Sequence, residues 1–174
     1  MKLYYLFLFL IVLLVPSCAE NKHKYFLMES HQIRDFITET NHIHTQFFPQ
    51  MNDDTYAVPS IDWINNEFTP ALRKFYFKYN LYNEANNEND CEDLALYAEA
   101  VARILYHNDS AKIKECAISV GHFDYLLSIE SHRIIMFVAH DEEKIKLIFY
   151  EPFAQQIIKD NNEITNHLVW NWEM

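Results

Sequence analysis

The pattern of apolar and polar positions divides the chain into a first part with helical spacing and a last part with strand spacing. Between residues 20 and 80, apolar side chains such as Ile33, Phe36 and Ile37 recur at intervals of three to four, with polar residues between them. This is the spacing of amphipathic helices, and a second stripe of the same kind follows Pro70. The pattern predicts two or three helices in this part of the chain.

The most clearly marked element is a helix that begins at Asp90. Asp90 is a residue type that caps helix N-termini, and Asp93 follows three positions later. The apolar stripe of this helix consists of Leu94, Ala98, Val101 and Leu105. We predict that the helix ends near residues 108–110, and that the polar residues 82–90 before it form an exposed loop.

The remainder of the chain has the pattern of β-strands. We predict one strand over residues 113–120, which includes Cys116, and another over residues 122–128. The clearest hairpin joins residues 132–139 to residues 144–151 through a short acidic turn. The first strand of this hairpin is apolar on both faces, so we expect it to lie in the centre of a sheet.

The length of the hairpin turn decides which side chains lie near each other. If Glu142 and Glu143 form a two-residue turn, Glu151 lies opposite Ile134 and His132 lies opposite Phe153. His132 and Glu151 are then diagonal neighbours on one face, with backbones about 7–8 Å apart. A three-residue turn would place them on opposite faces, so their contact is a prediction about register.

Composition and element order predict one α+β domain. The 174 residues are half apolar and 22% charged, which fits a single globular unit. Helices come first and a hairpin-rich antiparallel sheet comes later, so the predicted class is α+β. We expect a helical segment over residues 18–60, continuous in one unit with a main domain over residues 61–174.

Two further counts exclude classes of function. The formal net charge of −11 repels a polyanion, so nucleic acid is not an expected partner. Gly121 is the single glycine of the chain, which excludes a glycine-rich phosphate-binding loop.

The first residues have the order of an export signal. Lys2 is followed by an apolar run over residues 3–15, and then by Pro16, Ser17 and Cys18. This order predicts a signal peptide over residues 1–17. The segment around Cys18 also resembles a bacterial lipobox, which implies lipidation of Cys18 and anchoring in a membrane.

Two alternatives to the lipid anchor stay open. An ordinary signal peptide cut near Ala19 would release a soluble secreted protein, and an uncleaved segment would act as an anchor. All three interpretations place the body of the protein outside the cytosol. For a lipoprotein, Ala19 does not match the aspartate signal for retention in the inner membrane, so we expect the outer membrane, facing the periplasm.

Cys91 is the first candidate for chemistry. It lies in the first turn of the predicted helix, on its inward side, where the helix dipole favours a thiolate. Asp90, Glu92 and Asp93 oppose a negative charge there, so the thiolate needs a basic partner. The sequence leaves open whether Cys91 forms a disulfide with Cys116 or whether one of the two thiols is reactive and the other buried.

His132 and Glu151 complete a possible set for acyl transfer. An imidazole stabilises the thiolate and later protonates the leaving group, while a carboxylate fixes the orientation of the ring. His122, which follows Gly121, and His140 are rival histidines. Neither has so suitable a carboxylate on the next predicted strand.

These residues carry a resemblance to a known group of enzymes. Residues 89–95, Asn-Asp-Cys-Glu-Asp-Leu-Ala, resemble the Asp-Cys-Asp-Asp-Phe-Ala element of papain-like and transglutaminase-like cysteine enzymes, including the calcium-dependent protease domain of certain mushroom agglutinins. Residues 148–152, Ile-Phe-Tyr-Glu-Pro, resemble the closing element of that group. The resemblance covers roughly residues 63–153.

The resemblance implies a role for each candidate residue. Cys91 would be the nucleophile, His132 the general base and Glu151 the orienting carboxylate of an enzyme that cleaves or transfers amides. The substrate would be a protein or a peptide crosslink of the cell wall. The chain departs from the group at His132, because Ser131 and Arg133 flank it where the group has glycine and alanine. A second hypothesis is therefore an inactive lipoprotein of the same fold that binds a partner at the cell envelope.

The sequence predicts no cofactor or metal of its own. The acidic group Asp90, Glu92 and Asp93 is typical of a capped helix start, although the agglutinin resemblance implies that calcium could bind there. The nine histidines show no zinc-binding spacing. In the tail over residues 161–174, Trp170 and Trp172 alternate as in a short strand or an exposed aromatic patch, and both interpretations stay open.

Overall fold

A computed structural model of the chain describes residues 23–40, 51–81, 90–113, 116–127, 130–142, 144–159 and 169–173. The predicted signal peptide over residues 1–17, the lipidation candidate Cys18 and most of the predicted loop, residues 82–89, lie outside the described residues. Within the described ranges, none of the helices combines the length and the apolar character needed to cross a bilayer.

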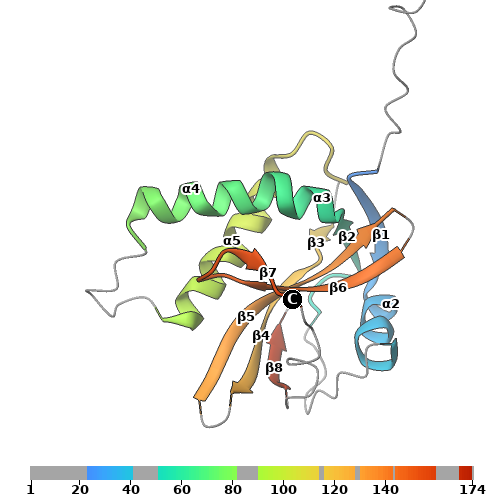
Figure 1. Cartoon of the computed structure of the whole chain (residues 1–174). Coiled ribbons are helices and arrows are strands. Elements are labelled where there is room, and N and C mark those ends of the chain that lie inside the picture. Colours follow the sequence, from blue (N-terminus) through green and yellow to red (C-terminus); the bar gives the residue numbers. More distant parts are fainter. Residues whose placement is uncertain are drawn as a thin grey trace, which may run out of the picture.

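The helices gather on the two faces of a sheet (Figure 1). They are α2 (Ser30–Asp35), η1 (Phe36–Thr40), α3 (Ile61–Trp63), η2 (Ile64–Phe68), α4 (Thr69–Tyr79) and α5 (Cys91–Asn108). The predicted helices after Pro59 are confirmed, and they follow one another without a break from Ile61 to Tyr79. Asn80 ends α4 in the left-handed conformation with φ of 54°, which asparagine tolerates better than most residues.

The strands form two sheets. The first has the order β1-β2-β3, and the second has the order β7-β6-β5-β4-β8. Their bounds are β1 (Tyr25–Glu29), β2 (Thr55–Pro59), β3 (Ala117–Ile118), β4 (Val120–Leu127), β5 (Glu130–Asp141), β6 (Lys144–Glu151), β7 (Gln156–Ile157) and β8 (Val169–Glu173). β5 lies in the middle of the second sheet, as its two apolar faces predict.

The prediction that the segment over residues 18–60 is helical is wrong for β1 and β2. These strands pair in antiparallel register, with Tyr25 opposite Pro59. Residues 56–59 form a continuous buried run, and so short an apolar run cannot be assigned to helix or strand by its periodicity. Pairing between two segments that lie about 30 residues apart decides the conformation, and helix is confined to α2 and η1 in this part of the described chain.

The single strand predicted over residues 113–120 is also wrong, because the chain changes sheets at Ser119. β3 pairs in parallel with β2, and β4 then begins in the other sheet. The Ser119 hydroxyl oxygen lies 3.1 Å from the carbonyl oxygen of Ala57 and 2.7 Å from that of Val138, so its one proton is shared between the two acceptors. Buried Ser119 thus joins the two sheets at the point where the strand breaks, and Cys116 lies just before β3.

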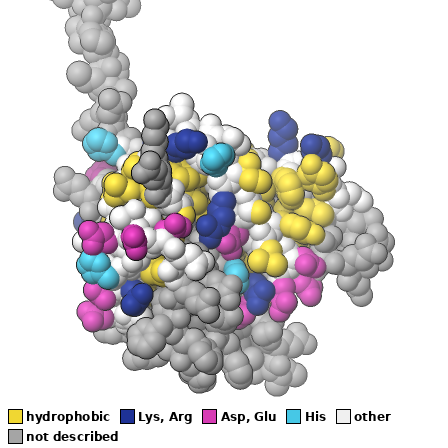
Figure 2. All heavy atoms as spheres, turned by 180° about the vertical axis from the view of Figure 1, so that it is seen from behind, with side chains coloured by type: hydrophobic (Ala, Val, Ile, Leu, Met, Phe, Trp, Pro, Cys, Tyr) yellow, Lys and Arg dark blue, Asp and Glu magenta, His cyan; other side chains and the backbone are white. Residues whose placement is uncertain are grey.

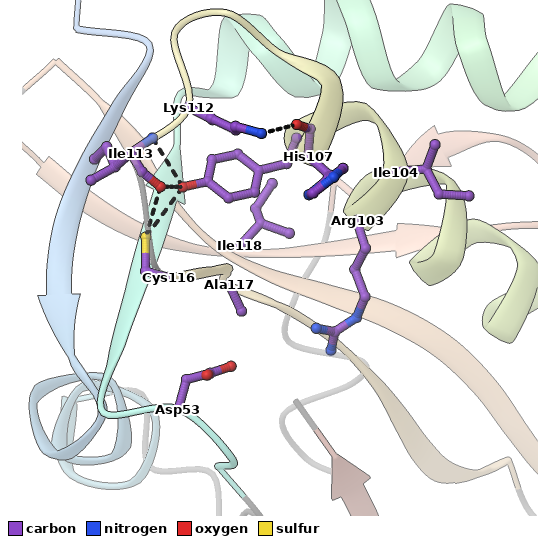
Figure 3. Close-up of a pocket in the computed structure, with 10 residues that line it drawn as sticks. Asp53, Arg103, Ile104, His107, Lys112, Ile113, Cys116, Ala117 and Ile118 are labelled. Atoms are coloured by element: carbon purple, nitrogen blue, oxygen red, sulfur yellow. Dashed lines mark hydrogen bonds between the residues drawn. The ribbon is translucent and has the colours of Figure 1, made fainter.

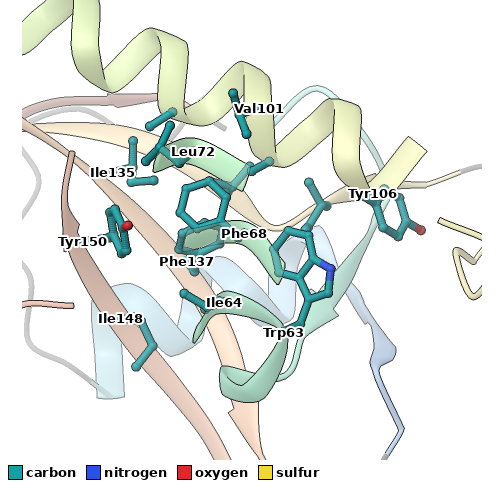
Figure 4. Close-up of a cluster of buried hydrophobic side chains, with 14 of the residues drawn as sticks. Trp63, Ile64, Phe68, Leu72, Val101, Tyr106, Ile135, Phe137, Ile148 and Tyr150 are labelled. Atoms are coloured by element: carbon teal, nitrogen blue, oxygen red, sulfur yellow. The ribbon is translucent and has the colours of Figure 1, made fainter. Parts of the chain in front are cut away.

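The two faces of β5 bury two different apolar clusters. Ile135 and Phe137 face the helices α3 to α5, whereas Ile134 and Met136 face α2 and β2. On the helix side, Phe68 packs edge-on against Phe137, with ring centroids 5.1 Å apart (Figure 4). The even-numbered and odd-numbered residues of β5 therefore project to opposite sides, which matters for the site described below.

A charged cluster ties the start of β1 to the end of α5. The Lys24 ammonium lies 2.7 Å from Glu67 and 2.5 Å from Asp109, and the Tyr25 hydroxyl donates to Asp109 at 2.8 Å. Burial alone would raise the pKa of Asp109, but its hydrogen bonds from Lys24, the Ala111 N–H and Tyr25 lower it on balance. The cluster joins segments that are more than 80 residues apart in sequence.

The α+β class predicted from the sequence is confirmed, with α4 and α5 on one side of the second sheet and α2 on the other side next to β1 (Figure 1). On the face seen in Figure 2, basic and acidic side chains are interspersed with hydrophobic ones.

Candidate functional site

Cys91 is the first residue of α5, and Asp90 caps the helix as predicted. The Asp90 Oδ1 atom accepts hydrogen bonds from the backbone N–H groups of Glu92 (3.0 Å) and Asp93 (3.2 Å). The Cys91 side chain is half-buried and its thiol is free. The nucleophile candidate therefore occupies the positive end of an 18-residue helix.

The structure brings His132 and Glu151 together. Asp141 pairs with Lys144, so the hairpin has the two-residue turn on which the predicted contact depends, and Glu142 adopts a φ of 57° in it. The His132 Nε2 atom lies 2.7 Å from Glu151 Oε2. The N–H of Phe153 donates to the other carboxylate oxygen at 3.1 Å, which fixes the orientation of the carboxylate. The predicted register and the predicted contact are both confirmed.

This hydrogen bond also distinguishes the two ring nitrogens of His132 by their position relative to Glu151. Nε2 is engaged by the carboxylate, so Nδ1 is the nitrogen on the opposite side of the ring from Glu151. Both side chains are accessible, since His132 is 25% exposed and Glu151 is 19% exposed. An accessible imidazole held by a carboxylate is suited to proton transfer with a bound molecule.

Arg133 is the neighbouring side chain that reaches the start of α5. Its guanidinium binds Asp124 through two bonds of 2.5 and 2.8 Å, and it lies 3.9 Å from Glu92. The hydrogen bonds with Asp124 raise the pKa of Arg133, and negative charge on Glu92 and Cys91 acts in the same direction. The cation close to Cys91 is thus a guanidinium that its partners hold in place.

Cys91 and His132 are not joined in this structure. Both residues lie in the described part of the chain, and no hydrogen bond links the Cys91 thiol to the His132 ring there. Ile135 and Phe137 pack on the helix side of β5, whereas Ile134 and Met136 pack on the other side. Strand alternation extends this pattern to Arg133 on the helix side and to His132 on the other side.

The rival histidines have other partners. The His122 Nδ1 atom lies 2.9 Å from Glu99, which also binds Arg103. Glu99 lies eight residues after Cys91, about 12 Å along α5. His140 is buried, with its ring centroid 4.6 Å from that of Phe26.

Cys116 has different surroundings from Cys91. Its thiol is free and lies 3.2 Å from the Tyr106 hydroxyl, near the other end of α5. The sequence left open whether Cys91 and Cys116 form a disulfide or remain separate thiols. Among the described residues both are free thiols, so the disulfide is not formed. In the parts of the chain that the structure describes, no group of three or more His, Cys, Asp or Glu side chains is arranged to hold a metal ion.

Comparison with known proteins shows a similarity of fold. The sequence matches no protein-family profile and no curated protein. Polyporus squamosus lectin bound to a human-type influenza-binding epitope is similar in structure, with a TM-score of 0.63 and 13% identity over 85% of this chain and 49% of that chain. A structure described as "PSL1a-E64 complex" is similar at a TM-score of 0.62 and 14% identity, over 85% of this chain and 51% of that chain. The chain shares its fold with these structures.

The likeness has a limited extent. The chain spans about half the length of each of these structures. A mushroom lectin as a structural neighbour agrees with the resemblance to mushroom agglutinins noted in the sequence, and at such low identity it speaks for the fold alone.

The pair of Arg133 and Asp124 is the feature of this site that the sequence did not indicate. Arg133 is evident as a bulky cation next to His132, but its carboxylate partner depends on the register between β4 and β5. Asp124 lies directly opposite Arg133 in that register. Opposite charges on two neighbouring predicted strands are the only sequence signal for the pair, and such a signal does not fix a register.

Proposed function

We propose that this protein is a cysteine hydrolase or acyltransferase that acts on amide bonds. Cys91 is the nucleophile, His132 the general base and Glu151 the carboxylate that orients the imidazole. The observation that carries the proposal is the 2.7 Å hydrogen bond between His132 and Glu151, formed across the hairpin next to a helix that begins with a cysteine. A carboxylate that holds one ring nitrogen orients the imidazole for proton exchange with a thiol through the other.

The proposed reaction has two stages. The His132 ring takes the thiol proton, and the Cys91 sulfur attacks the carbonyl carbon of the amide. The backbone N–H of Cys91 donates to the oxyanion at the positive end of α5. The imidazolium then gives its proton to the departing amine, which leaves a thioester on Cys91. Water releases the acid in a hydrolase, and a second amine takes the acyl group in a transferase.

We also propose that the protein is exported and carries a lipid on Cys18. The order of Lys2, an apolar run and the segment around Cys18 supports export, and Ala19 supports the outer membrane, facing the periplasm. The partners are then a membrane, through the lipid, and a protein or peptide substrate. In a bacterial host, Cys18→Ser should move the protein from the membrane fraction to the soluble fraction. An unchanged membrane fraction would contradict the lipid anchor.

The pH dependence of iodoacetamide alkylation tests the catalytic proposal. Peptide mapping of the full chain reads Cys91 and Cys116 separately. We expect Cys91 to react rapidly below pH 7 and to lose this reactivity in His132→Ala, with a smaller loss in Glu151→Gln. His140→Ala is the matched control, because His140 lies in the same strand and does not bind Glu151. An ordinary thiol profile for Cys91, unchanged by His132→Ala, would refute the triad.

A second function is favoured by Arg133. Its guanidinium is held by Asp124 and lies on the side of β5 that faces α5. A guanidinium stays protonated at ordinary pH, and this cation near Cys91 therefore cannot act as a general base. This arrangement fits an inactive module that binds a partner at the cell envelope. Slow labelling of Cys91 with an ordinary thiol profile would support the binding module, and fast labelling that depends on His132 would support the enzyme.

A further inference from the structure

The outward face of α4 differs in charge from the chain as a whole. Residues 68–83 contain the basic side chains of Arg73, Lys74 and Lys78 and no acidic residue, whereas acidic residues outnumber basic ones by 25 to 14 in the whole chain. All three basic side chains are exposed. Lys74 and Lys78 are four residues apart, so they lie on one face of the helix. α4 thus presents a cationic surface on a protein of negative net charge.

The contacts of these side chains do not cancel their charge. Among the described residues, none of the three forms an ion pair with a carboxylate. Arg73 donates to the Gln155 carbonyl oxygen at 3.5 Å, and the Lys78 ammonium lies 5.0 Å from the centre of the Tyr79 ring. Both partners are uncharged, so the face keeps its positive charge.

Phe77 projects from the middle of this cationic face. It is 85% exposed, the largest exposed fraction among the large apolar side chains of the described chain. Phe77 lies four residues after Arg73 and three after Lys74, which places it beside both on the helix surface. On the inner side of α4, Leu72 and Tyr76 are fully buried in the core. The exposed ring therefore takes no part in the packing of the domain.

Leu96 on α5 is exposed in the opposite electrostatic setting. It is 46% exposed and lies four residues after Glu92 and three residues before Glu99. This spacing puts the two acidic residues beside Leu96 on the surface of α5. An exposed apolar side chain is thus accompanied by positive charge on α4 and by negative charge on α5, which makes Leu96 a control for Phe77.

We propose that the outward face of α4 binds the surface of a bilayer that contains anionic phospholipids. Arg73, Lys74 and Lys78 lie against the lipid phosphates, and the Phe77 ring enters the boundary between headgroups and acyl chains. Basic residues are attracted to an anionic membrane surface, and an apolar ring gains free energy by leaving water there. This contact is additional to the lipid proposed on Cys18 and does not require it.

The start of the described chain lies next to this helix. The Lys24 ammonium lies 2.7 Å from Glu67, two residues before α4 begins, and Figure 1 shows α3 beside the start of β1. Cys18 precedes Lys24 by six residues, which span at most about 20 Å. The 11 residues of α4 extend over about 16 Å. A lipid on Cys18 would therefore hold α4 within reach of the same bilayer.

Vesicle binding by a chain without the lipid tests the proposal. The full chain carrying Cys18→Ser is sedimented with vesicles of phosphatidylcholine alone, or of equal parts of phosphatidylcholine and phosphatidylglycerol. We expect tighter binding to the anionic vesicles, and added salt should remove the difference because it screens the charges. Residues 1–17 are the same in every sample, so the ratios between variants report on the substituted residue.

Substitution of a lysine tests the role of charge. Lys74→Gln should weaken binding to the anionic vesicles about fivefold, the effect of one basic residue near a charged membrane, and should leave binding to neutral vesicles unchanged. Lys144→Gln is the matched control, because Lys144 is exposed at the tip of the β5–β6 hairpin and the change in net charge is the same. It should leave both affinities unchanged.

Substitution of the ring tests the apolar contact. Phe77→Ala should weaken binding to both kinds of vesicle roughly tenfold, because the ring acts through burial and not through charge. Phe77→Leu keeps an apolar side chain and should retain most of the affinity. Leu96→Ala removes an exposed apolar side chain from the acidic face of α5 and should have no effect. Thermal unfolding of each variant confirms that these exposed positions leave the fold intact.

Four outcomes would overturn the proposal. Equal affinity for the two kinds of vesicle, or equal effects of Lys74→Gln and Lys144→Gln, would show that the charges of α4 do not bind the membrane. An unchanged affinity of Phe77→Ala would show that the ring does not enter it. A soluble oligomer that dissociates in Lys74→Gln would show that α4 binds the acidic face of α5 in a second copy. The lipid is absent from every sample and Cys91 takes no part, so these outcomes leave the lipid anchor and the catalytic proposal to their own tests.

Discussion

The two described cysteines lie near opposite ends of α5, and their surroundings differ in almost every respect. Cys91 is the first residue of the helix, beside acidic residues and within the influence of Arg133. Cys116 lies near the last turns, 3.2 Å from the Tyr106 hydroxyl and in the wall of a pocket. The helix dipole favours negative charge at the first position and opposes it at the second. The same side chain thus has opposite electrostatic surroundings near the two ends of the helix.

This comparison shows why a count of cysteines says little about their use. The residues around each thiol decide whether a thiolate is stabilised. At Cys91 these are a helix N-terminus and a guanidinium, and at Cys116 they are a hydroxyl and aliphatic side chains. Single substitutions should change the reactivity of the two thiols either together or one at a time.

Phe68→Ala should remove the difference in reactivity between Cys91 and Cys116. Phe68 is fully buried between α3 and β5 and contacts Trp63, Phe137 and Tyr150. Its loss leaves a cavity beneath the helices and should cost about 3–5 kcal/mol of unfolding free energy. Urea denaturation gives this value, and both thiols should become reactive in the same transition. Phe77→Ala is the matched control, because Phe77 is 85% exposed, and an equal cost for the two variants would contradict the role given to Phe68.

Asp90→Ala should loosen the Cys91 end alone. The substitution removes the side-chain cap from the N–H groups of Glu92 and Asp93 and should cost about 1 kcal/mol. We expect faster labelling of Cys91 under native conditions, with Cys116 unchanged, as read by peptide mapping. Asp90→Asn keeps a capping oxygen and should stay close to the parent protein. A similar acceleration at Cys116 would show that the cap stabilises the whole helix.

Tyr106→Phe should loosen the Cys116 end alone. The hydroxyl donates to the Ile113 carbonyl at 2.6 Å and contacts Cys116, and burial together with the Cys116 contact raises the pKa of Tyr106. Its removal should cost roughly 0.5–1.5 kcal/mol, the net value of a typical hydrogen bond. Labelling of Cys116 should accelerate while that of Cys91 does not change. Tyr79→Phe, at an exposed ring, provides the comparison that should have no effect on either thiol.

Glu99→Gln should produce the smallest effect, and one that depends on pH. Burial alone would raise the pKa of Glu99, but hydrogen bonds from His122 and Arg103 lower it below its usual value of 4.5. A carboxylate with a lowered pKa contributes stability above its ordinary pKa and loses that contribution as the pH falls through the folded-state pKa.

The difference in unfolding free energy between the parent protein and Glu99→Gln should therefore be present at neutral pH and shrink as the pH falls below 4.5. Chemical denaturation at a series of pH values measures it. Because Glu99 lies midway along α5, neither thiol should change its labelling rate. A difference that grows toward acid pH would reverse the sign given to this group.

The parts of the site that could be predicted are those with local signals. Asp90 caps its own helix within three residues, and the Glu142 turn fixes the register that brings His132 to Glu151. These features depend on residues close in sequence, so the sequence pattern indicates them directly.

The parts that could not be predicted depend on partners far apart in sequence. β1 and β2 acquire strand conformation by pairing with each other, and Ser119 breaks a strand because it bonds to Ala57 and Val138. The pocket that Cys116 lines is assembled from Asp53, the end of α5 and residues 112–113 and 116–118 (Figure 3). The position of Arg133 relative to Cys91 likewise follows from which side of β5 faces the helix. Periodicity cannot specify such contacts.

The charged cluster at the start of β1 has a mechanical consequence. Tension applied to the chain from its N-terminal side reaches Lys24 before it reaches the hydrogen-bonded ladder between β1 and β2. Lys24 and Tyr25 transfer that load to Asp109 at the end of α5 and to Glu67, so the pull is shared between a strand and a helix. A domain held by its N-terminus in this way resists peeling of its first strand.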